Sequence, residues 1–283
     1  MIEEFSRCTL GLQTTILKRL EGKTAIVIGA GQGPGDGMGN GRATVLRFAQ
    51  QGAKVMAVDR NLASAEETVS MVKQAGGECV AFEADVTKEV TLAAMTAAAQ
   101  KRWGRIDILH YNVGVSIAGG DAPLLDFTEE AFDRISATNL RGAIMACKHV
   151  IPIMRQQRAG AIITISSLAA LENYPFVAYK TTKAAMIAFT QQVAIQNAEY
   201  GVRANVILPG LIDTPMAVDT RARVSGKSRV QVAAERDARV PLRHKMGTAW
   251  DVANAALFLA SEEANFITGV ALLVDGGGAL NIG

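Results

Sequence analysis

The sequence predicts a single α/β domain built on a doubly wound, parallel sheet of seven strands. Short hydrophobic runs alternate along the chain with segments of helical periodicity. The runs are continuously apolar rather than alternating in and out, so helices should cover both faces of the sheet. No linker, internal repeat or low-complexity tract divides the 283 residues, and one domain is therefore expected over residues 21–283.

The strands and the helices between them follow in chain order. The predicted strands are Thr24–Ile28, Lys54–Val58, Cys79–Glu83, Ile106–His110, Ala161–Ile165, Arg203–Leu208 and Val270–Val274. Ser64-Ala65-Glu66-Glu67 has the pattern of a capping box and is expected to begin a helix. A longer helix is expected from Val177 to Tyr200, because this segment has no Pro or Gly and stops at Gly201.

The composition describes a globular protein and excludes several classes of function. Hydrophobic residues make up 49% of the chain and charged residues 20%, and the net charge of +2 gives no electrostatic case for nucleic acid or an anionic membrane. The three cysteines (Cys8, Cys79 and Cys147) are widely spaced and have no histidines at ligand spacing, so neither disulfides nor a metal site is expected. No stretch reaches the ~20 apolar residues that span a bilayer. The acidic start at Glu3 and Glu4 argues against a secretory signal, and a cytoplasmic protein with an N-terminal extension over residues 1–20 is expected.

A glycine-rich turn follows the first strand. The strand Thr24–Ile28 leads directly into residues 29–41, which contain seven glycines, and a helix follows from Arg42. Glycines allow a sharp turn and a close approach to a pyrophosphate, whose charge is stabilised by the free N–H groups of a helix N-terminus. A strand, a glycine-rich turn and a helix in this order predict a Rossmann-like site for a dinucleotide.

The acid that ends the second strand indicates which dinucleotide. Asp59 lies 18 residues beyond Gly41, where a carboxylate can accept both hydroxyls of the adenosine ribose. The same carboxylate would repel a 2′-phosphate, so NAD is favoured over NADP. The adjacent Arg60 could partner that phosphate if Asp59 turned away, and Asp59 could also be an ordinary strand-end cap.

Tyr179 and Lys183 form the candidate catalytic pair. They are four residues apart in the expected helix, so their side chains leave the same face one turn apart. A nearby ammonium lowers the pKa of a phenol, and a tyrosine tuned in this way can exchange a proton with an alcohol or a ketone. Ser166 and Ser167 follow the fifth strand, at the sheet edge where ligands of open α/β folds bind.

With these motifs in place, the chain from Leu20 to Gly277 resembles a classical short-chain dehydrogenase/reductase. The resemblance implies a catalytic tetrad of Asn139, Ser167, Tyr179 and Lys183, with Ser166 as the alternative serine. By the resemblance, the tyrosine exchanges the proton and the lysine lowers its pKa and holds the nicotinamide ribose. The serine orients the substrate oxygen, and the asparagine anchors a water in a proton relay.

The resemblance also implies a set of cofactor contacts and an assembly. Besides Tyr179 and Lys183, the implied contacts are Gly29, Gly31, Gly39, Asn40, Gly41, Asp59, Arg60, Asp85, Val86, Asn112, Gly114, Pro209, Gly210, Ile212 and Thr214. The segments from Asp251 to Gly277 resemble the last helix and strand of the family, which usually belong to a tetramer interface, so a homotetramer is expected.

Three departures from the family pattern stand out. The best register of the glycine turn uses Gly29, Gly39 and Gly41, which implies an insertion over Gly33–Met38 that we expect to bulge into solvent rather than to reach over the phosphates. Tyr111 replaces the first asparagine of the family's Asn-Asn-Ala-Gly motif, and an altered packing contact is expected there. Ser167 stands twelve rather than thirteen residues before Tyr179.

The expected function is hydride transfer between NAD and a secondary alcohol or ketone. Residues 211–245 should form a lid over the substrate. The candidate pocket residues are Leu168, Asn173, Tyr174, Phe176 and Met216, whose apolar and aromatic mix favours a neutral or moderately hydrophobic substrate. Two alternatives stay open: an NADPH-dependent 3-oxoacyl reductase, and a non-catalytic dinucleotide-binding sensor or scaffold.

Overall fold

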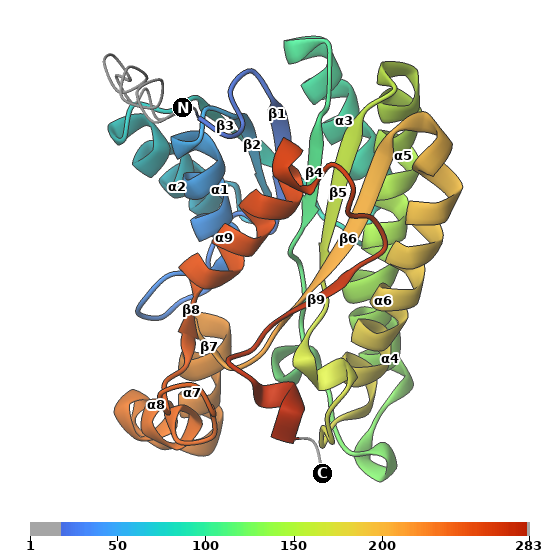
Figure 1. Cartoon of the computed structure of the whole chain (residues 1–283). Coiled ribbons are helices and arrows are strands. Elements are labelled where there is room, and N and C mark those ends of the chain that lie inside the picture. The colour runs from blue at the N-terminus through green and yellow to red at the C-terminus, as the bar shows by residue number, and fades with distance from the viewer. Residues whose placement is uncertain (1–17, 282–283) are drawn as a thin grey trace, which may run out of the picture.

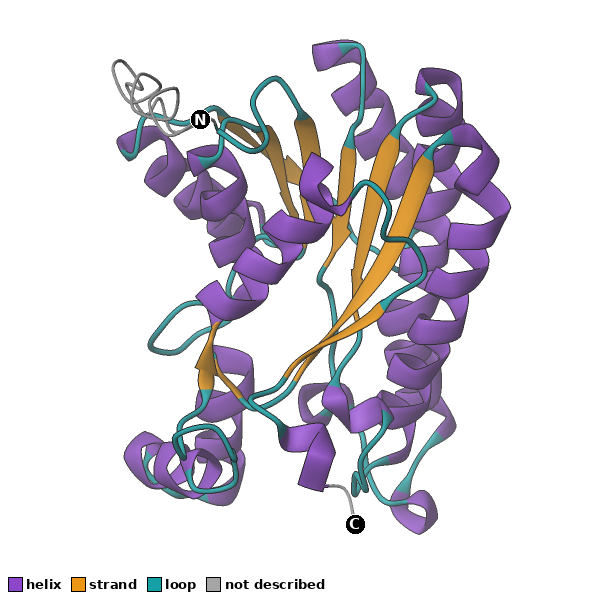
Figure 2. Ribbon diagram, viewed as in Figure 1, coloured by secondary structure: helices purple, strands orange, loops and turns teal. Residues whose placement is uncertain are grey.

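A sheet of seven parallel strands runs through the protein (Figures 1 and 2). The computed structural model describes residues 18–281. In spatial order the strands are β3 (Cys79–Glu83), β2 (Lys54–Asp59), β1 (Thr24–Ile28), β4 (Ile108–Tyr111), β5 (Gly160–Ile165), β6 (Val202–Pro209) and β9 (Ala271–Val274). All seven predicted strands are present, and the predicted fold class is confirmed.

The order of the strands reverses between β1 and β4. From β1 the chain moves outward through β2 to β3, and it then returns to the other side of β1 to add β4, β5 and β6. Such a reversal leaves a crevice at the carboxyl ends of the two central strands, where ligands of open α/β sheets bind. The glycine-rich turn follows β1 and therefore lies at this crevice.

Helices cover both faces of the sheet, as the continuously apolar strands predict (Figure 1). One face carries α1 (Asn40–Gln50), α2 (Leu62–Gln74) and α9 (Ala249–Ala260). The other carries α3 (Glu89–Trp103), α5 (Gly142–Gln157) and α6 (Val177–Asn197), with α4 (Glu129–Ser136) leading into α5. Each face has its own apolar core, which is why both sides of every central strand are buried.

The predicted boundaries hold for α6 and fail for α2. The chain leaves α6 through a short 3₁₀ turn and Gly201, which has the positive φ of 70° expected of a C-cap glycine. The capping box expected at Ser64 is wrong, because α2 begins two residues earlier at Leu62. Asn61 is its N-cap and accepts a hydrogen bond from Ser64 N at 3.3 Å. An asparagine just upstream thus provides the cap, and the Ser64 hydroxyl binds the glycine-rich turn instead.

Residues 211–245 form a small lobe beyond the carboxyl end of β6 (Figure 1). This lobe contains α7 (Thr220–Ser225) and α8 (Arg229–Asp237), and its first strand, β7 (Ile212–Asp213), pairs with β8 (Gly247–Thr248). A separate apolar cluster of Val218, Val232, Val240 and Met246 packs inside it. The lobe therefore has a core distinct from the two cores of the main sheet.

The described part of the N-terminal extension is short, and the described chain has neither a membrane-spanning helix nor a metal-binding group. Residues 1–17 of the predicted extension lie outside the described residues, whereas Leu20 is already fully buried in the core. Over residues 18–281, no helix is long and apolar enough to cross a membrane. The same part of the chain contains no group of His, Cys, Asp and Glu side chains that could hold a metal ion.

Candidate active site

Tyr179 and Lys183 lie in the first two turns of α6 and point toward the carboxyl ends of β4 and β5. The Lys183 Nζ atom is 5.7 Å from the centre of the Tyr179 ring. It donates a hydrogen bond of 2.7 Å to the carbonyl oxygen of Ile165, the last residue of β5. A hollow of about 500 Å³ lies at the opposite edge of the sheet, near Lys23 and Gly160 at the starts of β1 and β5, and neither Tyr179 nor Lys183 lines it.

Burial dominates the acid–base properties of this pair. The Lys183 side chain is almost completely buried, and loss of hydration lowers its pKa to about 7. Burial raises the pKa of Tyr179 to about 12, while a hydrogen bond with Ser167 opposes this rise. The sequence predicted a pKa lowered by Lys183, whereas here Lys183 Nζ donates to the carbonyl oxygens of Val113 and Ile165, and burial has the largest effect on the pKa of the phenol.

The two candidate serines have different surroundings. The Ser166 hydroxyl is buried and donates a 2.6 Å hydrogen bond to the carbonyl oxygen of Lys183, so it ties β5 to α6. Ser167 lies one residue further on, where its side chain interacts with Tyr179 and accepts a hydrogen bond from Ala169 N at 3.2 Å. Ser167 is therefore the serine that the structure brings to the Tyr179 hydroxyl.

Asn139 lies in a π-helical turn, Ala137–Arg141, between α4 and α5. Insertions of this kind in helices occur frequently at functional sites. The Asn139 side chain is fully buried, accepts a hydrogen bond from Val115 N at 2.8 Å and donates to Val115 O at 3.0 Å. It also donates to the Thr182 hydroxyl at 3.1 Å and so links the loop after β4 to α6, beside Lys183.

Tyr111, the departure from the family motif, supports this turn. Its ring is completely buried, and its hydroxyl donates a 2.6 Å hydrogen bond to the carbonyl oxygen of Thr138, next to Asn139. A Cβ at Gly142 would lie 2.5 Å from the Tyr111 hydroxyl, so the glycine leaves room for the phenol. Tyr111 thus places a buried hydroxyl beside the turn that carries Asn139.

Asp121 is a residue of the site that the sequence did not reveal. Its buried carboxylate accepts hydrogen bonds from Ala178 N at 2.9 Å and from Tyr179 N at 3.0 Å, and so caps the first turn of α6. It also accepts a 3.0 Å hydrogen bond from the Ser116 hydroxyl. An aspartate 58 residues upstream of the tyrosine gives no local signal, because this contact exists only in the folded chain.

Aromatic side chains form the rim around Tyr179. The ring of Tyr174 lies 5.6 Å from that of Tyr179 and 5.7 Å from that of Phe176, and its hydroxyl lies 3.3 Å from that of Ser116. Of the other candidate pocket residues, Leu168 is buried, whereas Asn173 and Met216 are exposed. Tyr174 is the candidate whose ring packs on that of Tyr179.

The turn after β1 has the close packing and free N–H groups that a dinucleotide requires. A Cβ at Gly41 would overlap the carbonyl oxygen of Gly29, so only glycine fits in the first turn of α1. Asn112 holds the same carbonyl through an Nδ2 hydrogen bond of 3.1 Å. Among the described residues, no side chain caps the N-terminus of α1 at Gly39, so N–H groups of its first turn are free to donate. These donors fit a pyrophosphate.

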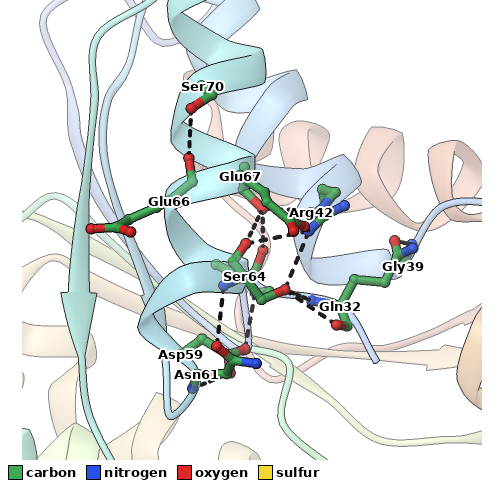
Figure 3. Close-up of polar contacts among 12 residues, drawn as sticks. Gln32, Gly39, Arg42, Asp59, Asn61, Ser64, Glu66, Glu67 and Ser70 are labelled. Atoms are coloured by element: carbon green, nitrogen blue, oxygen red, sulfur yellow. Dashed lines mark hydrogen bonds and ion pairs between the residues drawn. The ribbon is translucent and has the colours of Figure 1, made fainter. Parts of the chain in front are cut away.

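Asp59 stands against the glycine-rich turn (Figure 3). Its carboxylate accepts hydrogen bonds from Gly31 N at 2.9 Å and from Asn61 N at 3.0 Å. A Cβ at Gly31 would lie 2.8 Å from the Asp59 carboxylate and 2.9 Å from the Ser64 hydroxyl, which explains the glycine. Gln32 N donates to that hydroxyl at 2.8 Å, and the neighbouring Arg60 is exposed.

The inserted residues Gly33–Met38 are largely exposed, as expected of a bulge, and they also contact the lobe of residues 211–245. Asp36 N donates a 3.2 Å hydrogen bond to Asp219, and Arg223 donates to the carbonyl oxygen of Pro34 at 3.2 Å. Arg229 donates to the carbonyl oxygen of Asp36 at 3.4 Å. Charged side chains of the lobe thus bind the backbone of the exposed loop, which the sequence did not predict.

The remaining sequence-predicted residues lie along the same edge of the sheet. Asp85 and Val86 follow β3, and Gly114 packs against Lys183 so closely that an added Cβ would lie 3.0 Å from Nζ. The other four residues continue from the end of β6 into the lobe: Pro209, Gly210, Ile212 and Thr214. The structure thus brings the predicted cofactor residues to one edge of the sheet.

Comparisons with known proteins agree with this geometry. A family model described as enoyl-(acyl carrier protein) reductase matches residues 35–279. A 2-(R)-hydroxypropyl-CoM dehydrogenase of Xanthobacter autotrophicus is 38% identical over 90% of this chain and 97% of its own length. A 3-oxoacyl-[acyl-carrier-protein] reductase of Thermotoga maritima is 33% identical over 92% of this chain and 98% of its own length.

Solved structures give the same result. The crystal structure of a short-chain dehydrogenase/reductase from Burkholderia xenovorans is 42% identical, with a TM-score of 0.86 over 93% of this chain and 98% of that one. Levodione reductase is 28% identical, with the same TM-score over 93% of this chain and 100% of that one. The chain belongs to the classical short-chain dehydrogenase/reductase family, whose members use a nicotinamide cofactor, and it is an oxidoreductase that acts on CH–OH groups.

Proposed function

We propose that the protein is an NAD-dependent dehydrogenase of secondary alcohols that also reduces the corresponding ketones. The observation that carries the proposal is the meeting of Ser167 and Tyr179 at the carboxyl end of β5, with Lys183 and Asn139 directly behind them. A hydroxyl pair of this kind can hold the oxygen of an alcohol and exchange its proton.

Each of the four residues has a role in this proposal. Tyr179 donates its proton to the ketone oxygen in reduction and accepts the alcohol proton in oxidation, while Ser167 orients that oxygen. The cofactor accepts or supplies the hydride. Lys183 binds the nicotinamide ribose and, when charged, favours the phenolate. Asn139 fixes the loop at Val115 and positions α6 through Thr182.

The preference for NAD rests on Asp59. Its carboxylate faces the glycine-rich turn at the end of β2, where it can accept the hydroxyls of an adenosine ribose. A 2′-phosphate would bring two negative groups together at this position. The proposed cofactor contacts are those that the sequence identified, from Gly29 through Thr214, and the lobe of residues 211–245 is proposed to be the lid over the substrate.

The related proteins support two candidate reactions. The relative named as a 2-(R)-hydroxypropyl-CoM dehydrogenase has a secondary alcohol in its name and favours the dehydrogenase. The relative named as a 3-oxoacyl reductase supports the alternative of an NADPH-dependent 3-oxoacyl reductase. Asp59 argues against this alternative, because its carboxylate would repel the 2′-phosphate of NADPH. A non-catalytic sensor is set aside, because the family is one of enzymes and the four catalytic residue types are all present.

A homotetramer is proposed as the assembly. The edge strand β9 leaves Leu273 40% exposed, and the nearby Phe266 is fully exposed. Exposed apolar groups on a sheet edge are typical of interfaces between subunits. Sedimentation of the purified protein gives the oligomeric state directly.

A dehydrogenase screen tests the proposed reaction. The protein is mixed with NAD and a panel of chemically diverse secondary alcohols, and the absorbance of the reduced nicotinamide is followed. The proposal expects oxidation of at least one alcohol class, with NAD used better than NADP. A protein that binds NADH and yet turns over no alcohol and no ketone would contradict it.

A further inference from the structure

Arg236 of α8 is a buried cation without a counterion. Only 8% of its surface is exposed. Its side chain makes no ion pair or hydrogen bond with any of residues 18–281, and its Nε atom is buried without a partner. A guanidinium does not lose its proton in proteins, and burial of an unpaired charge is unfavourable. Such a side chain is suited to bind an anionic ligand.

Two further arginines line the same pocket. Arg221 of α7 and Arg239, which follows α8, border a pocket of about 350 Å³ together with Arg236. Burial, together with repulsion from Arg221 and Arg239, lowers the pKa of Arg236 to about 10, although Asp213 acts in the opposite direction. The one acid that lines this pocket, Glu235, is already paired with Lys227 at 2.6 Å. The pocket is therefore strongly positive.

Besides these charged residues, Ser225 and Lys227 line the pocket, and the remaining lining is aliphatic. Ile117, Val224 and Val232 contribute side chains to the pocket. Arginines beside aliphatic groups suit a ligand with an anionic head and a short hydrocarbon stem. The lobe itself does not need the three charges for packing, since its core is formed by Val218, Val240 and their neighbours.

The pocket lies at the substrate end of the site. Ile117 follows Ser116, whose hydroxyl is 3.3 Å from that of Tyr174, and Tyr174 packs on Tyr179. Burial raises the pKa of Tyr179, and Arg221 is a cation close enough to oppose that rise. The adenosine end of the predicted cofactor site is instead marked by Asp59, so a cofactor phosphate does not explain these arginines.

We propose that Arg236, flanked by Arg221 and Arg239, binds an anionic head group, a carboxylate, sulfonate or phosphate, at the far end of the alcohol substrate. The inference rests on the proposed function for the position of the reacting carbon. The proposed anionic substrate differs from the neutral substrate that the sequence favoured. The sequence could not show the cationic pocket, because arginines spread over residues 211–245 come together only in the folded lobe.

Matched anionic and neutral alcohols test the proposal. The probes are 3-hydroxybutane-1-sulfonate, 4-hydroxypentane-1-sulfonate, 5-hydroxyhexane-1-sulfonate and the three corresponding sulfonamides, oxidised with NAD. We expect the best sulfonate to exceed its sulfonamide in kcat/KM by about 30-fold, within the range for hydrogen bonds to charged groups. Arg236→Gln should reduce this ratio about tenfold or more, mainly through KM, and Arg236→Lys should retain part of it.

Arg243→Gln is the matched control. It removes the same charge from an exposed position in the same lobe, outside the pocket, and should leave the ratio unchanged. General damage to the fold would lower kcat/KM for both members of a pair and leave their ratio intact. If Arg236→Gln does not fold, Arg221→Gln provides the same test, with the same expected fall in the ratio.

Calorimetric binding of pentane-1-sulfonate to the NADH-loaded protein separates this proposal from the proposed function. Binding that Arg236→Gln abolishes supports the anion pocket even if no alcohol is oxidised, in which case the proposed function fails alone. The anion pocket would be overturned if the sulfonate-to-sulfonamide ratio of kcat/KM were near one at every chain length and pentane-1-sulfonate did not bind. Oxidation of plain 2-alkanols in that case would still support the proposed function.

Discussion

Replacement of Asp121 by alanine should loosen the start of the helix that carries Tyr179. The Asp121 carboxylate accepts three hydrogen bonds, from Ala178 N, Tyr179 N and the Ser116 hydroxyl, at 2.9, 3.0 and 3.0 Å. No other side chain caps α6, because its N-cap residue, Phe176, has no acceptor. The variant therefore leaves two helix N–H groups and one hydroxyl without their partner.

The expected loss of stability follows from these bonds. Loss of an N-cap side chain costs about 0.5–2 kcal/mol, and a charged acceptor stabilises more than a neutral one. For a carboxylate that is buried and holds a third donor, we expect a loss of about 2–3 kcal/mol. In a protein of this size that corresponds to a fall in Tm of roughly 6 °C.

Calorimetry and steady-state kinetics measure the two consequences. Asp121→Ala should also lower kcat by about tenfold or more, because the Tyr179 backbone is no longer fixed. Asp121→Asn keeps one acceptor oxygen, so its Tm and kcat should lie between those of Asp121→Ala and those of the wild type. Asp126→Ala, at an exposed position on the same loop, is the control. A Tm within 1 °C of wild type together with an unchanged kcat for Asp121→Ala would refute the reasoning.

Three further predictions concern other buried or charged groups. His110 is fully buried with neither ring nitrogen bonded in the described chain, and burial lowers its pKa to about 3. Because its unfolded pKa is about 6.5, the unfolded chain binds the proton first, and stability falls as the pH drops below 6.5 toward the folded value. At pH 5 this effect destabilises the folded protein by about 2 kcal/mol. Between pH 7 and pH 5, the free energy of unfolding should therefore fall by about 2 kcal/mol more in the wild type than in His110→Leu. Equal falls in the two proteins would exclude an unpaired neutral imidazole. Asp59→Ser should lower kcat/KM for NAD at least tenfold and raise the NADP to NAD ratio, because the ribose acceptor and the repulsive charge disappear together; a wild type that prefers NADP would contradict the assignment. Tyr111→Phe removes the 2.6 Å hydrogen bond to Thr138 O and should reduce stability by about 1 kcal/mol, measured by urea denaturation, whereas no change would mean that water replaces the hydroxyl.

The sheet could be predicted from the sequence because burial on both faces leaves a local signal. Each strand of a parallel sheet covered by helices must be apolar throughout, and the predicted runs differ from the observed strands by two residues at most. The strand β4 begins at Ile108 rather than at Ile106, since the Gln157 side chain already binds the amide and the carbonyl of Ile106. A side chain 51 residues away cannot be foreseen from periodicity.

The positions of the candidate catalytic residues were predictable for a different reason. Tyr179 and Lys183 are one helical turn apart, and Ser167 ends a strand, so regular geometry alone places them at the same edge of the sheet. Asp121 and the lobe residues Arg221, Arg236 and Arg239 carry no such signal, because their neighbours are set only in the folded chain. The contact between the inserted glycine loop and the lobe was missed for the same reason, as its partner Asp219 lies 183 residues further along the chain.

In the proposed mechanism the Tyr179 hydroxyl transfers the proton. Tyr179→Phe removes that oxygen and should leave NADH binding, measured by fluorescence titration, within about threefold of wild type. Tyr200→Phe, just beyond the other end of α6, is the matched control and should keep full turnover. With the best alcohol from the screen, the account predicts that Tyr179→Phe lowers kcat at least about a hundredfold. Near-normal kcat in that variant, with NADH bound as in wild type, would contradict it.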